Sequence, residues 1–365
     1  MRVAVGLSGG VDSAVSALML KEAGHEVVGV TMRLWRPGRY RGGAEGSCFG
    51  PGEEKGIASA AALAEAIGIP HRVFDLNGDY EREVVAYFRE TYLAGRTPNP
   101  CVRCNAFVKF GLLPRVAAAA GLAFDKFATG HYARVLCRDG RQTLLRGVDL
   151  AKDQSYFLYR LSQEQLARTL FPLGASTKAD VRRFARERGL VVADRPDSQD
   201  FCTGGTDDLI GEPDRPGDIV DLSGRVLGRH RGFWHYTIGQ RKGLGIGGAG
   251  EPYYVVELQA ALNRVVVGRA DDAVSTALDV SEMNYVSLAP PPAGAPPIPC
   301  RVKVRSAGKL VPAFLEGTRC TFPAGIAGVA PGQSAVFYAA EGEDVLCGGE
   351  IARCMSAGGP RTARP

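Results

Sequence analysis

The sequence of 365 residues predicts an α/β fold, in which a parallel-sheet domain is followed by a small, mostly-β central domain and a C-terminal β-barrel. Two patterns support this prediction. Over residues 1–110 short apolar strands alternate with helix-forming runs, which is typical of a parallel sheet with helices on both faces. After about residue 205 the strands become short and are separated by glycine and proline, which indicates a small barrel or sandwich.

The N-terminal elements follow from local periodicity. We expect strands at Val3–Leu7, Val27–Met32, His71–Leu76 and Lys126–Thr129, and helices at Ala14–Ala23, Gly56–Ile67, Tyr80–Ala94 and Phe107–Ala120. Arg36–Gly52 is rich in glycine, arginine and proline and is expected to be a mobile loop that contains Cys48. Thr97–Pro100 carries two prolines and cannot lie inside a helix. In such a sheet the site is expected at the carboxyl ends of the strands.

The C-terminal elements are short strands. We expect them at Asp218–Asp221, Arg225–Leu227, Tyr253–Leu258, Arg264–Val267, Cys300–Arg305, Pro312–Leu315, Thr318–Phe322, Ser334–Ala339 and Asp344–Ile351. Pro290–Pro299 is a proline-rich linker. The expected domains are residues 1–205, 206–275 and 276–355, with a disordered tail at 356–365.

The first strand leads into a loop that suits a bound anion. The loop is Ser8-Gly9-Gly10-Val11-Asp12-Ser13, directly before a helix. Its backbone N–H groups and the positive end of the helix dipole favour an anion, and the two glycines let a ligand approach the backbone. Ser8 and Ser13 add hydroxyl donors, and Asp12 is a candidate ligand for magnesium beside phosphates. The loop is neither a Walker loop nor a dinucleotide fingerprint, and the alternative is an ordinary strand–turn–helix corner.

Composition indicates a globular protein. Hydrophobic residues make up 45% and charged residues 23%, the formal net charge is +5, and no run of eighteen apolar residues predicts a membrane span. The start of the chain has no signal-peptide layout, so we expect a cytoplasmic protein. Two stretches, 96–115 and 225–242, contain lysine and arginine but no acidic residue, and the second includes Phe233, Trp234 and Tyr236. Such stretches suit RNA, although a solvated basic face is the alternative.

The nine cysteines are too scattered for a disulfide scaffold. Cys101 and Cys104 form a C-x-x-C motif beside the prolines, and Cys202 stands about one hundred residues later. We expect both segments on loops of the sheet. The motif has no second pair of ligands for a zinc site, and a two-cysteine redox motif is a second alternative. The other cysteines with strand-like or tail contexts, expected to be core or surface residues, are Cys137, Cys300, Cys320, Cys347 and Cys354.

A nucleotide loop together with loop cysteines suggests a class of reaction. ATP turns an oxygen into a leaving group, and a cysteine persulfide then delivers sulfur. A second thiol is needed to free that sulfur, which leaves a disulfide to be reduced. This chemistry requires two cysteines near one AMP site.

Seven motifs, in order from residue 3 to about residue 351, resemble those of the bacterial tRNA-specific 2-thiouridylases (the MnmA family). The loop at residues 8–13 resembles the pyrophosphate loop of the ATP pyrophosphatases. The other motifs are Thr97–Pro100 with Cys104-Asn105, Ala128–Tyr132, Lys152–Leu158, Ser198-Gln199 with Cys202, Thr237–Ile246 and Pro331–Tyr338. The family thiolates C2 of the wobble uridine in the tRNAs for lysine, glutamate and glutamine, so the resemblance implies this activity here.

The resemblance also implies roles for residues. Residues 1–205 would form an ATP pyrophosphatase (adenine nucleotide α hydrolase-like) domain, and 206–275 a tRNA-binding domain. ATP, with Mg, would be bound by Gly6, Leu7, Ser8, Gly9, Gly10, Val11, Asp12, Ser13, Met32 and Gly130. The flipped target base would contact Asn99, Pro100 and position 101, and tRNA would contact His131, Lys152, Asp153, Gln154, Arg305, Ser306 and Gln333. Cys202 would carry a persulfide supplied by a cysteine desulfurase or a sulfur-relay protein, and Cys104 would be the paired catalytic thiol.

The thiolate of a reactive cysteine needs an electropositive setting, for which Arg103 and Lys109 are candidates beside Cys104. Three positions depart from the family's pattern. Cys101 stands where many members have aspartate, so Cys101, Cys104 and Cys202 could instead ligate a [4Fe-4S] cluster. Arg305-Ser306 replaces the usual Arg-Tyr, and Glu53-Glu54 stands in place of the usual acidic pair.

Two other functions are open at this point. One is a different ATP pyrophosphatase, a ligase or amidotransferase with an amine nucleophile, which needs neither Cys104 nor Cys202. The other is a non-catalytic RNA-binding or sulfur-carrier protein with a vestigial loop.

Overall fold

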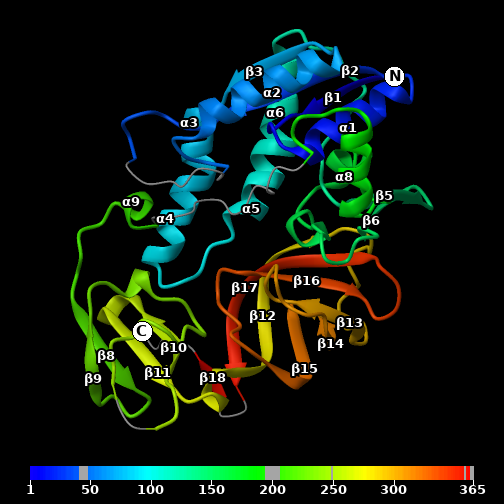
Figure 1. Cartoon of the computed structure of the whole chain (residues 1–365). Coiled ribbons are helices and arrows are strands. Elements are labelled where there is room, and N and C mark those ends of the chain that lie inside the picture. The colour runs from blue at the N-terminus through cyan, green and yellow to red at the C-terminus, as the bar shows by residue number, and fades with distance from the viewer. Residues whose placement is uncertain (41–47, 194–205, 248–249, 357–358, 362–365) are drawn as a thin grey trace. The chain divides into compact units, whose positions relative to one another are not determined.

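The computed structural model describes residues 1–365 except 41–47, 194–205, 248–249, 357–358 and 362–365 (Figure 1). The chain divides into two compact units. The first unit comprises Met1–Val85, Pro100–Leu209 and Glu343–Val345, and the second comprises Ala86–Asn99, Ile210–Gly342 and Leu346–Pro365. The segment before Pro100 therefore belongs with the β-rich half of the chain, although its neighbours in the sequence are α/β.

The first unit is built on a parallel sheet, as predicted. Its five strands are β1 (Arg2–Gly6), β2 (Glu26–Arg33), β3 (His71–Asp75), β4 (Lys126–Ala128) and β7 (Thr169–Leu170), in the order β3-β2-β1-β4-β7. The chain moves from β1 toward one edge and then returns to β4 on the other side of β1. This reversal is the topological switch point, outside which open α/β sheets bind ligands. The loop after β1 and the segment after β4 both lie there.

Helices flank this sheet. They are α1 (Val11–Glu22), α2 (Glu53–Ile67), α3 (Asn77–Tyr80), the π-helix η1 (Glu81–Val85), α5 (Pro100–Arg103), the π-helix η2 (Cys104–Leu112), α6 (Leu113–Ala119), α7 (Gln163–Ala167) and α8 (Lys178–Glu187). The short helix α9 (Thr206–Ile210) spans the boundary between Leu209 of the first unit and Ile210 of the second. Val3 and Val5 of β1 pack with Val15 of α1, Leu63 of α2 and Ala185 of α8 in one fully buried core. Burial of this apolar stripe fixes where α1 begins relative to the sheet.

Local chemistry explains several boundaries. Gly68, in the left-handed conformation at φ 70°, ends α2. Thr177 and Asp180 form a capping box at the start of α8. Glu53 accepts hydrogen bonds from the backbone N–H groups of Leu34 (2.8 Å) and Trp35 (2.9 Å), so this acidic residue ties α2 to the end of β2.

The structure corrects the prediction that Cys101 and Cys104 lie on a loop. Pro100 is the first residue of α5, and the helical path continues through η2 and α6 to Ala119. Proline suits a first helical position because its φ angle is preset and its missing N–H would have had no partner there. The sequence predicts a helix here only from Phe107, seven residues after the observed start. The preceding helix was predicted from Tyr80, whereas α3 begins at Asn77. The antiparallel hairpin β5 (Ala133–Arg138) and β6 (Arg141–Arg146), strand β7, and helices α7 and α8 were not predicted.

The second unit is β-rich, again as predicted. It begins with helix α4 (Ala86–Leu93) and contains a four-stranded sheet of β8 (Gly217–Asp221), β9 (Val226–His230), β10 (Tyr254–Gln259) and β11 (Arg264–Gly268), in the order β10-β11-β8-β9. Short 3₁₀ turns follow at Phe233–His235, Ala260–Leu262 and Asp271–Ala273.

The predicted C-terminal barrel is present and closed. Its strands are β12 (Val274–Tyr285), β13 (Ile298–Lys303), β14 (Val311–Glu316), β15 (Arg319–Ala327), β16 (Ser334–Ala339) and β17 (Val345–Ser356), with β18 (Gly359–Arg361) added to β17. The order is β12-β15-β14-β13-β16-β17, and pairing of β12 with β17 closes it (Figure 1). Cys300, Cys320, Cys347 and Cys354 are buried in its core, as expected for small apolar residues.

We expect the interior of the barrel, and not its surface, to carry the stability of this part. Replacing the fully buried Phe337 with alanine should lower the free energy of unfolding by about 3–5 kcal/mol, because it leaves a cavity. Phe314 lies on the same barrel but is 46% exposed, so Phe314→Ala is the matched control and should cost less than about 1 kcal/mol. Urea unfolding followed by circular dichroism measures both. Equal losses would contradict the packing described.

Candidate active site

The loop between β1 and α1 is held open at a helix N-terminus. Gly9 has φ +79°, and a Cβ on it would lie 2.7 Å from the carbonyl oxygen of Gly56, so no larger residue fits. Gly10 precedes α1, and among the described residues no side chain caps that helix. The first N–H groups of α1 and the positive end of its dipole are therefore directed at any anion that binds the loop.

Serine hydroxyls fix the shape of this loop. Ser13 Oγ donates to the carbonyl oxygen of Gly10 (3.1 Å) and accepts from the N–H of Ser8 (3.2 Å). Ser59 of α2 donates to the carbonyl oxygen of Gly9 (3.2 Å). These bonds preform the concave backbone, so a phosphate would meet a loop that is already ordered.

Asp12 is paired with a lysine that sequence reasoning missed. Lys178 Nζ lies 2.8 Å from both carboxylate oxygens of Asp12, and the Tyr132 hydroxyl donates to Oδ1 of Asp12 at 2.8 Å. The Lys178 side chain is only 11% exposed. It stands at the start of α8, where the helix dipole disfavours a cation, and this local conflict is the one signal in the sequence that could have marked it.

The role of Asp12 as a magnesium ligand beside phosphates stays a prediction. Both Asp12 oxygens are used by Lys178, and no group of three or more His, Cys, Asp or Glu among those residues could hold a metal ion. Beside a nucleotide, magnesium takes one or two carboxylates and completes its ligands with phosphate and water oxygens, so a set of three protein ligands is not required. The cluster suggested for Cys101, Cys104 and Cys202 cannot be placed, because Cys202 lies outside the described residues.

The segment after β4 approaches the loop closely. A Cβ on Gly130 would lie 2.8 Å from the carbonyl carbon of Asp12 and 2.9 Å from the nitrogen of Ser13, so only glycine fits. His131 Nδ1 bonds the Thr129 hydroxyl at 2.8 Å. Burial, together with the nearby Lys109 ammonium, holds the pKa of His131 well below its ordinary value, so this ring is neutral.

On the other side of the loop, β2 carries Met32. Its neighbour Thr31 donates a hydrogen bond to the carbonyl oxygen of Leu7 (2.8 Å) and therefore accepts one from Nε2 of His71 (2.8 Å). Burial lowers the pKa of His71. Thr31 thus anchors the start of the loop, and half-buried Met32 follows it at the same end of the sheet.

Lys152, Asp153 and Gln154 differ in their surroundings. Gln154 accepts from the N–H of Tyr132 (3.0 Å) and donates its own N–H to the carbonyl oxygen of Tyr132 (2.9 Å). The Asp153 side chain is 1% exposed and pairs with Arg146 at 3.1 Å. Only Lys152 is exposed. Gln154 therefore supports Tyr132, and through it Asp12, while Asp153 pairs with Arg146; the predicted contact of both residues with tRNA stays a prediction.

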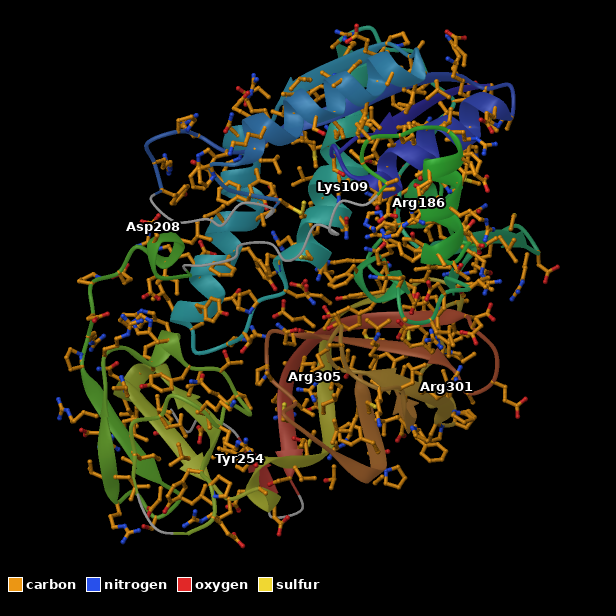
Figure 2. The ribbon with its side chains drawn as sticks, in the orientation of Figure 1. Lys109, Arg186, Asp208, Tyr254, Arg301 and Arg305 are labelled. Atoms are coloured by element: carbon orange, nitrogen blue, oxygen red, sulfur yellow. The ribbon has the colours of Figure 1, made fainter. Side chains whose placement is uncertain are left out.

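Cys104 and Lys109 share one π-helix, η2. Lys109 is labelled in Figure 2. In a π-helix the backbone bonds run between residues five apart, so positions 104 and 109 come to the same side. Burial raises the pKa of the Cys104 thiol to about 11, while the Lys109 ammonium acts in the opposite direction. Arg103, the other candidate cation, donates to the carbonyl oxygen of Glu83 (2.6 Å) instead. Cys48, Cys101 and Cys104 all act electrostatically on buried Tyr80, whose pKa is raised chiefly by burial.

The remaining predicted residues lie in the second unit. Asn99 is 8% exposed, and its N–H donates to the Tyr87 hydroxyl (3.3 Å). Arg305 and Ser306 are exposed just after β13. Arg305 is labelled in Figure 2. Gln333 is half-buried in the loop before β16. The roles assigned to all these residues stay predictions, as does that of Cys202.

Comparison with known proteins gives the family. Three family models match in order: a tRNA methyl transferase HUP domain at residues 1–204, a tRNA methyl transferase PRC-barrel domain at 210–269, and an aminomethyltransferase β-barrel domain at 275–351. In the described part of the chain, no helix is long and apolar enough to cross a membrane. A solved 4-thiouridine synthetase–RNA complex with bound ATP is similar over 53% of this chain and 42% of that one, at 16% identity and a TM-score of 0.35.

Two full-length relatives are much closer. A protein of Endomicrobium trichonymphae is 44% identical over 361 residues, which is 96% of this chain and 99% of that one. A protein of Carboxydothermus hydrogenoformans is 42% identical over 366 residues, with 96% and 97% covered. Both are named tRNA-specific 2-thiouridylase MnmA. Since this similarity spans almost the whole of both chains, the protein belongs to the tRNA-specific 2-thiouridylase (MnmA) family.

Proposed function

We propose that this protein is an ATP-dependent tRNA 2-thiouridylase. It adenylates O2 of the wobble uridine in the tRNAs for lysine, glutamate and glutamine, and then exchanges that oxygen for sulfur with release of AMP and pyrophosphate. The observation that carries the proposal is a single unit that holds both an anion-binding loop, with Asp12 paired to Lys178, and a thiol, Cys104, under the influence of Lys109. The named relatives and the sequence motifs support the same activity.

The first step is adenylation. The uracil O2 attacks the α-phosphorus of ATP, and pyrophosphate leaves with the electron pair of the broken P–O bond. Negative charge develops on the phosphoryl oxygens, so preorganised donors lower the barrier. The N–H groups at the start of α1 are such donors, whereas the Ser13 hydroxyl donates to the carbonyl oxygen of Gly10 and shapes the loop. Lys178, close to Asp12, is the cation that neutralises charge at this end of the sheet.

The second step replaces AMP by sulfur. Either the terminal sulfur of a Cys202 persulfide attacks C2, or the Cys104 thiolate attacks the inner sulfur of that persulfide and frees hydrosulfide, which then attacks C2. AMP leaves with the C2–O2 bond pair. In the first route the Cys104 thiolate then attacks the Cys202 sulfur and releases the thiolated base, so both routes leave a Cys104–Cys202 disulfide, which an external dithiol reduces. Only a minority of Cys104 is thiolate at neutral pH, so Lys109 sets how much is reactive.

We also propose the partners of the protein and its location in the cell. The substrate is tRNA, the sulfur comes from a cysteine desulfurase or a relay protein, and the site of action is the cytoplasm. Residues 1–205 act as the catalytic domain, 206–275 bind tRNA and 276–355 form the barrel domain; the three family-model matches support these limits. The descriptions of two of those models name a methyl transferase, but the full-length relatives are named thiouridylases, and a cysteine pair suits sulfur transfer.

A second version of the mechanism runs through a [4Fe-4S] cluster on Cys101, Cys104 and Cys202. The observation that favours it is the presence of Cys101 within the same helical segment as Cys104, where both act on Tyr80. Anaerobic purification with iron and sulfide analysis, followed by a thiolation assay on the same sample, separates the two versions. Full activity of iron-free protein would exclude the cluster.

Cys104→Ser should abolish thiolation while tRNA-dependent release of pyrophosphate continues, because adenylation does not need the thiol. The matched control is Cys137→Ser, an exposed cysteine of strand β5, which should keep full activity. Thiolated tRNA is quantified by its retardation in mercury-containing gels, and pyrophosphate by an enzyme-coupled assay. Full thiolation by the Cys104 variant would refute sulfur transfer through this residue.

Lys178→Met should lower the rate of adenylation by at least about 100-fold, the usual effect of removing a group that stabilises a charged transition state. The double variant Asp12→Asn with Lys178→Met removes the pair without leaving an unpaired charge. If Lys178 only neutralised Asp12, the double variant would recover activity; we expect it to stay inactive. Lys21→Met, which removes a lysine bound to the carbonyl oxygen of Gly68, is the control for loss of a lysine.

The rate of thiolation should rise with pH, because the reactive form of Cys104 is the thiolate and its pKa is about 11. Lys109→Met removes the cation that lowers this pKa, so the thiolate fraction at neutral pH falls and the whole pH–rate curve moves upward in pH. Lys109→Arg should keep the wild-type curve. A loss of rate in Lys109→Met that does not shrink as pH rises would contradict an electrostatic role.

A further inference from the structure

The segment before Pro100 is fastened to a loop of the C-terminal barrel. The N–H of Thr97 donates to the carbonyl oxygen of Pro331 at 2.8 Å. In return, the side-chain Nε2 of Gln333 donates to the carbonyl oxygens of Pro98 (2.7 Å) and Thr97 (3.2 Å). One amide group of the barrel therefore satisfies two main-chain acceptors of this segment. All these residues belong to the second unit.

The residue between Pro331 and Gln333 has to be glycine. Gly332 has φ +92°, and a Cβ on it would lie 2.7, 2.9 and 3.0 Å from the oxygen, nitrogen and carbonyl carbon of Thr97. Strand β17 of the barrel fixes this turn by two backbone hydrogen bonds. The N–H of Gly332 donates to the carbonyl oxygen of Ile351 (2.9 Å), and the N–H of Ile351 donates to the carbonyl oxygen of Gln333 (2.8 Å). The main chain of Thr97 therefore lies directly against that of Gly332.

A second set of contacts holds the ends of the segment. Arg96 pairs with Glu350 of β17 at 2.7 Å. The Tyr87 hydroxyl of α4 accepts from the N–H of Asn99 (3.3 Å) and lies 3.4 Å from Oε2 of Glu350, to which it donates. Glu350 is thus linked to both ends of the segment.

The two prolines explain why outside support is needed. Pro98 and Pro100 have no N–H, so the segment cannot be held in a helix or a strand ladder of its own. Fixing it costs conformational entropy that only contacts with other parts of the chain can offset. The consequence is that Asn99, which is 8% exposed, stands between a clamped Thr97-Pro98 and the first residue of α5.

We propose that Pro331–Gln333 is a clamp that fixes Asn99 in position for the target uridine, and that Gln333 is a positioning residue acting through Thr97 and Pro98. The inference rests on the proposed function, because it takes Asn99 as a base contact. It differs from the expectation that Gln333 touches tRNA itself. A displacement of a base-contacting group by about 1 Å is enough to cost roughly a hundredfold in rate.

Two variants of the full-length protein test the clamp. Gln333→Met keeps the length of the side chain but removes its donors, and Gly332→Ala drives a methyl group into Thr97. Amide hydrogen exchange of the unliganded protein reads the N–H groups of Thr97 and Asn99, which should exchange roughly tenfold faster in both variants. The matched control is Gln163→Met, whose amide donates to the carbonyl oxygen of Gln142 (2.9 Å) in the first unit. It should leave exchange at Thr97 and Asn99 unchanged.

Kinetics then separate positioning from direct contact. With the proposed clamp, kcat for thiolation falls at least about tenfold in Gln333→Met, while the Kd for tRNA changes less than about twofold. Weaker tRNA binding at unchanged kcat would overturn the positioning role in favour of direct contact. Unchanged exchange at Thr97 and Asn99 would overturn the clamp outright. A wild-type protein that thiolates no tRNA would refute the proposed function, and the exchange measurement would still decide the clamp.

Discussion

The pairing of Asp12 with Lys178 is the interaction on which the first unit's site depends. A carboxylate in the first turn of α1 is favourable for the helix but repels the phosphates that the same helix end attracts. The Lys178 ammonium neutralises this carboxylate, with Nζ 2.8 Å from Oδ1 of Asp12. Its own position at the start of α8 is unfavourable for a cation. Further bonds maintain that placement: the N–H of Lys178 donates to Asp149 at 2.9 Å, and Tyr132 bonds the same carboxylate. The site thus requires four separate segments of the chain to fold together.

This dependence shows what the sequence could predict. The strands β1 to β4, the loop and α1 were predictable because their signals are local: alternation, a glycine pair and a helix-forming run. The partner of Asp12 was not predictable, because Lys178 is 166 residues away and its one local signal, a cation at the start of a helix, does not say which residue it pairs with. Strand β7 has only two residues, too few to show the alternation of apolar and polar residues that predicts a strand. The barrel was predicted as a class, but its closure by β12 and β17 is a pairing between distant segments.

The helical setting of Cys104 changes the chemistry expected of it. On a loop, its reactivity would have been set by whatever charges were nearby. On a π-helix, Lys109 is placed by the backbone itself. The barrel cysteines show the contrast. Burial raises the pKa of Cys300 and of Cys347 to about 12, and no lysine or arginine contributes to either shift. Cys104 is buried as well, but a cation opposes the effect, so among these thiols it is the one suited to react.

The barrel fixes the position of a main-chain segment in the way that Lys178 and Lys109 set the charge around Asp12 and Cys104. Residues 97–99 carry the asparagine assigned to the target base, but the prolines that exclude them from a helix also deprive them of internal hydrogen bonds. Their geometry must then be specified elsewhere, and the clamp at Pro331–Gln333 specifies it with one side-chain amide and one glycine. A glycine is needed there for close approach, not for flexibility, and this reason is invisible without knowing that Thr97 lies against it. In the proposed mechanism the barrel therefore helps to orient the base, in addition to any surface it offers to tRNA.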